Sequence, residues 1–329
     1  MSSFAGKIAV VTGGGTGMGR ELCRALAREG AHVAMCDVVE DNMLETLALC
    51  EAEAAEGTRV TTFVADVSDE DAMNAFRDAV AAQHDTDHIH LLFNNAGIGG
   101  GGSFAAGERD LWEKTFGVCW YGVYYGARAF LPMLVNGPGG HLVNTSSVNG
   151  FWASIGPGIP HTAYSAAKFA VKGFTEALMT DLEVNAPHVQ AHLVMPGHIG
   201  TNIAINSGKI LGTAPEDLSA EDIQATRELM VSRGLPVSNE TDDHIRDMLR
   251  QQGEDFRNNA PMSAADAAAY IIDRVKAGDW RILVGDDAKK LDAAVRQTPA
   301  DAYKVEFLAR LANDGVFEKL NEAVQGLTD

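Results

Sequence analysis

The sequence predicts an α/β fold in which a doubly wound, mostly parallel sheet carries helices on both faces. Short apolar runs rich in β-branched residues alternate along the chain with longer segments of helical periodicity. This alternation is typical of parallel sheets, because a crossover helix follows each strand and packs on the sheet. A glycine-rich turn, residues 13–19, directly follows the first apolar run.

Each element has a local signal. The first strand is an apolar run that ends at glycines, and the first helix places Leu22, Cys23, Leu26 and Ala27 on one face before Gly30 ends it. Later strands and helices repeat these signals in alternation. The predicted strands are 7–12, 32–36, 59–65, 89–93, 141–145, 189–194 and 281–284. The predicted helices are 18–29, 41–56, 69–83, 108–135, 163–184 and 263–277.

Two segments lie outside this alternation. Residues 196–262 carry no strand signal but contain amphipathic helical patterns near 219–232 and 239–252, and the tail 299–329 has helical apolar spacing. We expect one Rossmann-type domain over 1–329. Its parts are a core of 1–195 and 263–298, a substrate lid of 196–262 and a C-terminal helical extension of 299–329. The lid residues expected to cover a pocket are Ile223, Met230, Ile245, Met248 and Leu249. The alternative use of the same side chains is a contact between subunits.

Composition excludes several classes of partner. Acidic residues outnumber basic ones 45 to 26 among 329 residues, giving a net charge of -19, so no nucleic-acid partner is expected. The longest apolar runs are far shorter than the roughly 20 residues that cross a bilayer, so no membrane partner is expected. The first seven residues do not resemble a signal peptide, and the four cysteines show no paired spacing. These features predict a cytoplasmic protein with reduced thiols and no metal site.

The glycine turn has the spacing G-x-x-x-G-x-G at Gly13, Gly17 and Gly19. Missing side chains would let the backbone approach a pyrophosphate at the start of a helix, although a plain strand–helix turn is the alternative. Asp37 ends the second strand, where a carboxylate accepts hydrogen bonds from ribose hydroxyls and repels a 2′-phosphate. No Arg or Lys lies within 13–19 or directly after Asp37, which favours NAD over NADP. Asp66 is placed either to meet the adenine or to cap the next helix.

A second group of polar residues follows the later strands. Tyr164 and Lys168 lie four residues apart, on one face of a helix. A tyrosine has a pKa of about 10, and a nearby ammonium stabilises its phenolate form. Tyr164 would then exchange a proton with a substrate hydroxyl or carbonyl.

With these residues the chain resembles the short-chain dehydrogenase/reductase family over residues 5–200 and the last helix–strand pair. The match consists of T-G-x-x-x-G-x-G, the N-N-A-G of residues 94–97, a serine before Y-x-x-x-K, and Pro196-Gly197 followed by Thr201. The resemblance implies that Tyr164 is the general acid/base, that Lys168 lowers its pKa, and that Ser147 holds the substrate oxygen. The cofactor contacts it implies are Gly13, Thr16, Gly17, Met18, Gly19, Asp37, Asp66, Val67, Asn94, Ala96, Gly97, Tyr164, Lys168, Pro196, Gly197, Ile199 and Thr201.

One position departs from the family pattern. Cys119 stands where the family usually has an asparagine that holds a water linking the lysine to solvent. A thiol is a weak hydrogen-bond partner. Either another group holds that water, which we favour, or Cys119 has a role of its own.

The expected substrate is a bulky hydrophobic secondary alcohol or its ketone, bound by Ser147, Trp152, Tyr164 and His198. Trp152 lies in the loop after the predicted strand 141–145, where an aromatic side chain is also compatible with a core position. The resemblance implies a homodimer or homotetramer built through helices 108–135 and 163–184.

Two other functions stay open. One is a non-catalytic NAD-binding sensor, which the presence of Ser147, Tyr164 and Lys168 disfavours, and the other is an epimerase or dehydratase of the extended family. The usual G-x-x-G-x-x-G of that family is not the spacing found here.

Overall fold

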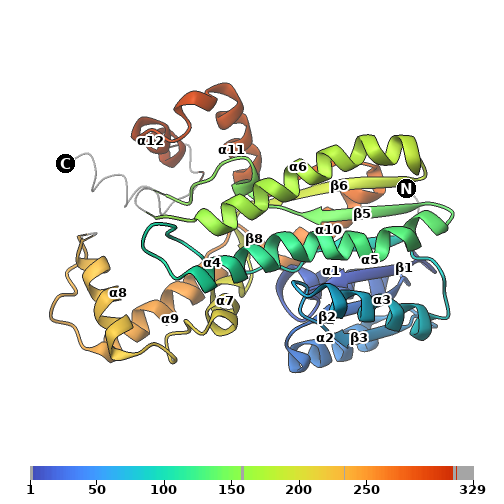
Figure 1. Cartoon of the computed structure of the whole chain (residues 1–329), viewed down its shortest axis with the longest axis horizontal. Helices are drawn as coiled ribbons and strands as arrows, with labels where there is room; N and C mark the ends of the chain where they lie inside the picture. Colours follow the sequence, from blue (N-terminus) through green and yellow to red (C-terminus); the bar gives the residue numbers. More distant parts are fainter. Residues whose placement is uncertain (1–2, 157–158, 233, 314–315, 317–329) are drawn as a thin grey trace.

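A computed structural model describes residues 3–156, 159–232, 234–313 and 316, and its central feature is a seven-stranded sheet (Figure 1). The strand order is β3-β2-β1-β4-β5-β6-β9, and every neighbouring pair is parallel. The strands are β1 Ile8–Thr12, β2 His32–Asp37, β3 Val60–Val64, β4 Leu91–Asn94, β5 Gly140–Thr145, β6 Val189–Pro196 and β9 Arg281–Val284. The predicted doubly wound α/β fold is confirmed. The direction of winding reverses between β1 and β4, where such sheets bind ligands.

Helices cover both faces of the sheet (Figure 1). Successive residues of β1 point to opposite faces, so Val10 packs in one core with Phe130, while Val11 packs in the other with Leu26 and Ile271. All five are at most 2% exposed. The helices of the core are α1 Gly17–Arg28, α2 Glu40–Glu53, α3 Glu70–His84, α4 Arg109–Phe116, α5 Gly122–Asn136, α6 Thr162–Asn185 and α10 Ala264–Ala277.

The long helix predicted over 108–135 is interrupted at its middle. A five-residue π-helical turn, Gly117–Tyr121, separates α4 from α5. A π turn adds a residue to the helical repeat and is frequent at functional sites. Here it contains the fully buried Cys119.

The segment 196–262 differs from its prediction in two respects. It contains strand: β7 Ile199–Gly200 pairs in parallel with β8 Met262–Ser263 and so joins the two ends of the segment. It also contains a short helix, α7 Ile203–Leu211, which the apolar spacing of the sequence did not predict. Because its ends are paired, the segment leaves and re-enters the core at one place.

The two amphipathic helices of this segment form as predicted, and their apolar faces pack on each other. In α8 Ala220–Ser232 and α9 Asp242–Asn258, the buried Ile223 and Ile245 pack with Val237, and Met230, Met248 and Leu249 surround them. Figure 1 shows α8 and α9 together beside the core. These side chains form a small core of their own, and the expectation that they cover a pocket stays a prediction.

The C-terminal part packs on the loop that follows β5. It consists of α11 Asp286–Gln297, a 3-10 turn Pro299–Asp301 and α12 Val305–Asn313. Leu291, Leu308 and Leu311 are buried there against Val148. The predicted extension beyond residue 316 lies outside the described residues. Figure 1 shows this part and the α8–α9 pair at the same end of the sheet.

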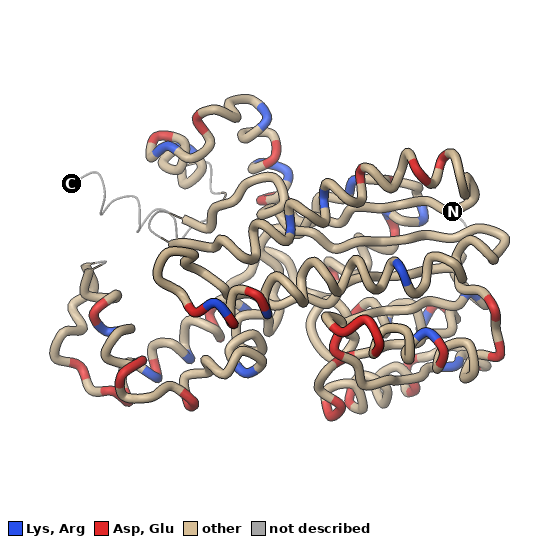
Figure 2. Tube along the Cα trace, in the orientation of Figure 1, with Lys and Arg blue, Asp and Glu red and all other residues tan. Residues whose placement is uncertain are grey.

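Figure 2 shows acidic positions spread along the trace, in the helices around the sheet as well as in the α8–α9 pair. Across the described ranges, no helix combines the length and apolar character needed to cross a bilayer. Within those same ranges, His, Cys, Asp and Glu side chains form no cluster of three or more suited to a metal ion.

Candidate active site

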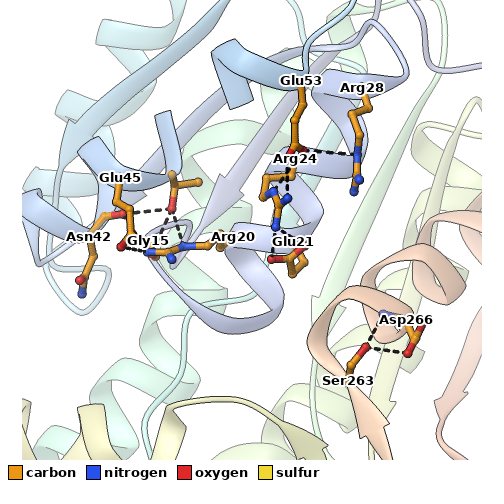
Figure 3. A network of polar contacts seen from close by, with 11 residues as sticks. Gly15, Arg20, Glu21, Arg24, Arg28, Asn42, Glu45, Glu53, Ser263 and Asp266 are labelled. Carbon is orange, nitrogen blue, oxygen red and sulfur yellow. Dashed lines mark hydrogen bonds and ion pairs between the residues drawn. The ribbon is translucent and has the colours of Figure 1, made fainter. Parts of the chain in front are cut away.

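The glycine turn after β1 has a backbone that only glycine tolerates. Gly13 and Gly17 have φ values of +67° and +56°, in the left-handed region. A Cβ at Gly19 would lie 1.9 Å from the Gly13 carbonyl oxygen. Arg20 fixes the turn from behind, since its Nη2 donates to the Gly15 carbonyl at 2.7 Å and pairs with Glu45 at 2.6 Å (Figure 3). The start of α1 is thereby held beside an open cleft.

This cleft lies at the carboxyl ends of β1, β2 and β4 and has a volume of about 340 Å³. Most of the predicted cofactor residues line it: Gly13, Thr16, Gly17, Met18, Gly19, Asp37, Asp66, Val67, Ala96, Gly97 and Thr201. Sequence reasoning missed several further lining residues: Val38, Val39, Asn42, Ala65, Asn95, Ile98, Lys114, Val118, Asn202, Ile203, Asn206, Lys209 and Ile210.

Six predicted cofactor residues do not line this cleft, and two of these, Tyr164 and Lys168, lie beside it with Ser147. Asn94 is 1% exposed and donates to the Asn144 side chain at 2.9 Å, while the next residue, Asn95, borders the cleft. Ile199 is 4% exposed in an apolar core. Pro196 ends β6, and Gly197 packs so closely on Asp287 that a Cβ would lie 2.2 Å from its carboxylate oxygen. The motifs predict cofactor contacts at these positions. In the structure Asn94, Ile199 and Gly197 contact other parts of the protein instead.

The two acids at the cleft are held by backbone amides. Asp37 accepts from the Gly15 N–H at 2.9 Å and from the Val39 N–H at 3.1 Å. Asp66 accepts from the backbone and hydroxyl of Ser68, at 2.9 and 2.7 Å. Asp69 caps α3 through the N–H groups of its first turn, so the alternative that Asp66 caps this helix is wrong.

Helix α7 forms one wall of the cleft. Asn206 donates to the Thr16 hydroxyl at 2.9 Å, and Ser207 accepts from the Gly99 N–H at 2.8 Å. From the opposite side, Lys114 donates to the Ile210 carbonyl at 2.8 Å. The sequence did contain a signal for this contact. Polar residues lie inside the apolar stretch 203–211, and buried polar side chains of a short helix need hydrogen-bond partners outside it.

The three predicted catalytic residues come together beside this cleft. Ser147 follows β5, and Tyr164 and Lys168 lie on the first turns of α6. The Lys168 Nζ is 5.4 Å from the centre of the Tyr164 ring and donates to the Thr145 carbonyl at 2.9 Å. A Cβ on Gly97 would be 3.4 Å from this Nζ, so Gly97 joins the cleft to the trio.

Burial dominates the electrostatics of the trio. It raises the pKa of Tyr164 well above the usual value; the nearby Cys119 adds to the rise, and a hydrogen bond with Ser147 opposes it. Burial also lowers the pKa of Lys168, while Cys119 opposes that shift. Desolvation of the phenolate therefore opposes the lowering of the Tyr164 pKa that is expected from the nearby ammonium.

Cys119 lies at the centre of this arrangement. Its thiol donates to the Ile98 carbonyl at 3.1 Å, directly after the N-N-A-G turn. Burial raises the pKa of the thiol, and the charge of Lys168 opposes the rise. The side chain is thus a neutral donor that fixes the end of the turn.

We expect Cys119→Asn to keep or raise turnover, because an amide donates to the same carbonyl more strongly than a thiol does. The measurement is kcat under saturating cofactor, with Cys119→Ala as the control that removes the bond to Ile98. A large loss of kcat in Cys119→Asn with an unchanged circular dichroism spectrum would mean that the thiol has its own function.

Both residues expected to touch only the substrate, Trp152 and His198, are engaged elsewhere. Trp152 is 1% exposed, and its Nε1 donates to the Ala302 carbonyl at 2.7 Å, so its place in the substrate pocket is wrong. The His198 ring lies 4.4 Å from that of Phe256 and its Nε2 bonds the Phe256 carbonyl at 2.7 Å. His198 therefore joins α9 to the turn after β6.

The comparisons with known proteins agree with this geometry. The sequence model of the family described as short chain dehydrogenase matches residues 7–210. SadH of Mycobacterium tuberculosis, whose name gives only the class oxidoreductase, is 36% identical over 296 residues, covering 90% of this chain and 92% of its own. Levodione reductase of Leifsonia aquatica is 34% identical over 223 residues, covering 67% and 79%.

A solved structure has the same fold. A short chain dehydrogenase/reductase from Burkholderia phymatum, solved in complex with NAD, superposes with a TM-score of 0.72 at 28% identity, covering 92% of this chain and 95% of its own. A metagenomic short-chain oxidoreductase solved with NADP has a TM-score of 0.52 at 30% identity, covering 60% and 84%. With the glycine turn, the Ser147, Tyr164 and Lys168 trio and the family match in agreement, this chain belongs to the short-chain dehydrogenase family and is an oxidoreductase.

Proposed function

We propose that this protein is an NAD-dependent dehydrogenase that interconverts a bulky hydrophobic secondary alcohol and its ketone. The observation that carries the proposal is the convergence of Ser147, Tyr164 and Lys168 at Gly97, which borders the dinucleotide cleft. A proton-transferring phenol beside a nicotinamide site is what alcohol oxidation requires, since the alcohol must lose a hydride and a proton together.

In the direction of oxidation, the substrate hydroxyl gives its proton to the Tyr164 phenolate oxygen while the carbinol carbon loses a hydride. A bound nicotinamide supplies the hydride acceptor and, when oxidised, a positive charge. Ser147 holds the reacting oxygen and Lys168 supplies a buried cation beside the phenol. Because burial raises the pKa of Tyr164, these charges are needed to favour the phenolate. In reduction, Tyr164 returns the proton to the ketone oxygen.

The cleft fits a dinucleotide. The close contact at Gly19 leaves no room for a side chain between the turn and α1, and the lining includes the cations Lys114 and Lys209. Structural neighbours have been solved with NAD and with NADP, so they do not discriminate between the two. The preference for NAD rests on Asp37, whose charge disfavours a 2′-phosphate.

We expect Asp37→Asn to reverse part of this preference. The amide oxygen can still accept from one of the two N–H groups, Gly15 or Val39, but the negative charge is gone. The ratio of kcat/KM for NADP to that for NAD should rise by about tenfold or more, the value of a hydrogen bond to a charged group. Asp66→Asn is the matched control. Wild-type protein that prefers NADP would contradict the assignment.

The experiment that tests the proposed function is a screen of absorbance at 340 nm with NAD and NADP. It uses bulky secondary alcohols in one direction and their ketones in the other. Turnover with NAD and such a substrate is the expected result. Tight NAD binding without turnover of any of them would favour the sensor, which is the remaining function from another class.

We also propose a homodimer or homotetramer assembled through α4, α5 and α6. Apolar and aromatic side chains on α6 and on the π turn between α4 and α5 are exposed, with Tyr121 and Phe169 each at 41% and Val184 at 75%. Light scattering should give a mass of two or four chains, and Phe169→Glu should shift it towards one. A wild-type mass of one chain would contradict this.

A cytoplasmic location is proposed as well. The support is that Cys23, Cys36, Cys50 and Cys119 are all buried free thiols.

A further inference from the structure

The His161 side chain differs from those of the other histidines in having no polar partner among the described residues. The chain contains ten histidines, and nine of them make a hydrogen bond or an ion pair with a described residue. Across the described residues, neither ring nitrogen of His161 has one. The side chain is half-buried, and its ring nitrogens are not among the fully buried unpaired atoms, so a ligand can reach them.

The imidazole of His161 lies on the catalytic tyrosine. Its ring centre is 4.7 Å from that of Tyr164, with 34° between the planes. His161 is therefore next to the phenol that exchanges the proton.

Hydrogen bonds fix the backbone at His161 and in the residues that follow it. The His161 carbonyl accepts from the Ser165 N–H at 3.1 Å, which makes His161 the residue directly before α6. Thr162 and Ala163 donate to the carbonyls of Gly102 and Gly101, at 2.9 and 3.1 Å. These bonds fix the backbone that carries the ring, and the ring itself lies against Tyr164.

The chemistry that the ring offers is that of a neutral imidazole. Burial lowers the pKa of His161 to about 4, so at neutral pH one nitrogen donates and the other accepts. Such a ring can donate to a carbonyl or ether oxygen and can accept from a hydroxyl. It does not add a charge beside the reacting oxygen.

We propose that His161 is a substrate-binding residue that hydrogen-bonds a second oxygen of the substrate, close to the carbon that is oxidised or reduced. Ser147 and Tyr164 take the reacting oxygen, which leaves the imidazole for an oxygen on a neighbouring carbon. The preferred substrates are then hydroxy ketones, diketones or alkoxy alcohols within the hydrophobic class. This inference rests on the proposed function and narrows its substrate.

A matched pair of ketones tests it. Benzil carries two adjacent carbonyls, and deoxybenzoin has the same skeleton with one. In His161→Phe, which keeps a ring against Tyr164 but removes both nitrogens, kcat/KM for benzil should fall by about tenfold or more, mainly through KM. The value for deoxybenzoin should change little. His161→Asn, which restores a donor and an acceptor, should recover part of the loss.

His244→Phe serves as the control, because His244 lies on α9 and pairs with Glu240. It should leave both ketones unaffected, and thermal unfolding of each variant shows whether it is folded. Equal losses of kcat/KM on both ketones in His161→Phe would overturn the inference and leave the ring a packing role. Wild-type reduction of deoxybenzoin but not benzil would overturn it while the proposed function stands. Reduction of neither, nor of any other ketone, would overturn the proposed function first.

Discussion

Tyr164→Phe is expected to lower kcat by about 10²- to 10⁴-fold, the range that a positioned general acid/base contributes. The substitution removes only the hydroxyl and keeps the ring that packs against His161. Without it no group of the trio can take the alcohol proton, since Lys168 is engaged with the Thr145 carbonyl. Initial rates at 340 nm measure the loss.

The loss should be confined to chemistry. NAD affinity, measured by calorimetry, should stay within a few-fold of the wild-type value, because the glycine turn and Asp37 are unchanged. Tyr270→Phe on α10 is the matched control: it removes a hydroxyl while keeping the ring beside Arg274 and Lys289. A Tyr164→Phe protein with wild-type kcat would sink the proposed mechanism.

Trp152→Ala is expected to lower the free energy of unfolding by about 3–5 kcal/mol, as for other large aromatic residues removed from a core. The side chain is 1% exposed and packs against Phe307 of α12 at a ring distance of 6.4 Å. The substitution also leaves the Ala302 carbonyl without its donor. Urea denaturation followed by circular dichroism measures the change.

Trp280→Ala is the control for this prediction, because it makes the same chemical change at a side chain that is 41% exposed. It should cost far less stability. Trp152→Phe should lie between the two, since it keeps an apolar ring and loses the hydrogen bond. If Trp152→Ala left stability unchanged and raised only the substrate KM, Trp152 would be a pocket residue after all.

The prediction for Trp152 also connects stability to the site. The Asn149 side chain donates to the Trp152 carbonyl at 3.0 Å, and the Asn149 N–H donates to the Ser147 hydroxyl at 3.1 Å. The C-terminal helices therefore support the loop that carries Ser147. We expect activity in Trp152→Ala to fall with the folded fraction.

Much of the site could be predicted because it depends on short spacings. Tyr164 and Lys168 share a helical face whatever surrounds them, and the positive φ of Gly13 and Gly17 is a local property of one turn. The ends of parallel strands meet at one edge, so the positions of Asp37 and Ser147 followed from the order of the elements.

Other predictions were wrong because the sequence does not show which distant residues an apolar side chain will pack against. Trp152 was assigned to the substrate pocket, yet its hydrogen-bond partner Ala302 lies 150 positions further along the chain. The stripes containing Ile223 and Ile245 predicted helices correctly, but the sequence did not show that they pack on each other. In the same way, Asn94 belongs to the site motif but points into the sheet towards Asn144.

The sequence by itself determined the alternation of strands and helices, the glycine turn and the spacing of the catalytic trio, because each depends on backbone geometry over a few residues. Only the tertiary structure decided that α7 walls the cleft, that the C-terminal helices bury Trp152, and that the His161 ring lies against Tyr164. These are contacts between surfaces distant in sequence, whose free energy depends on shape and desolvation once the chain has folded.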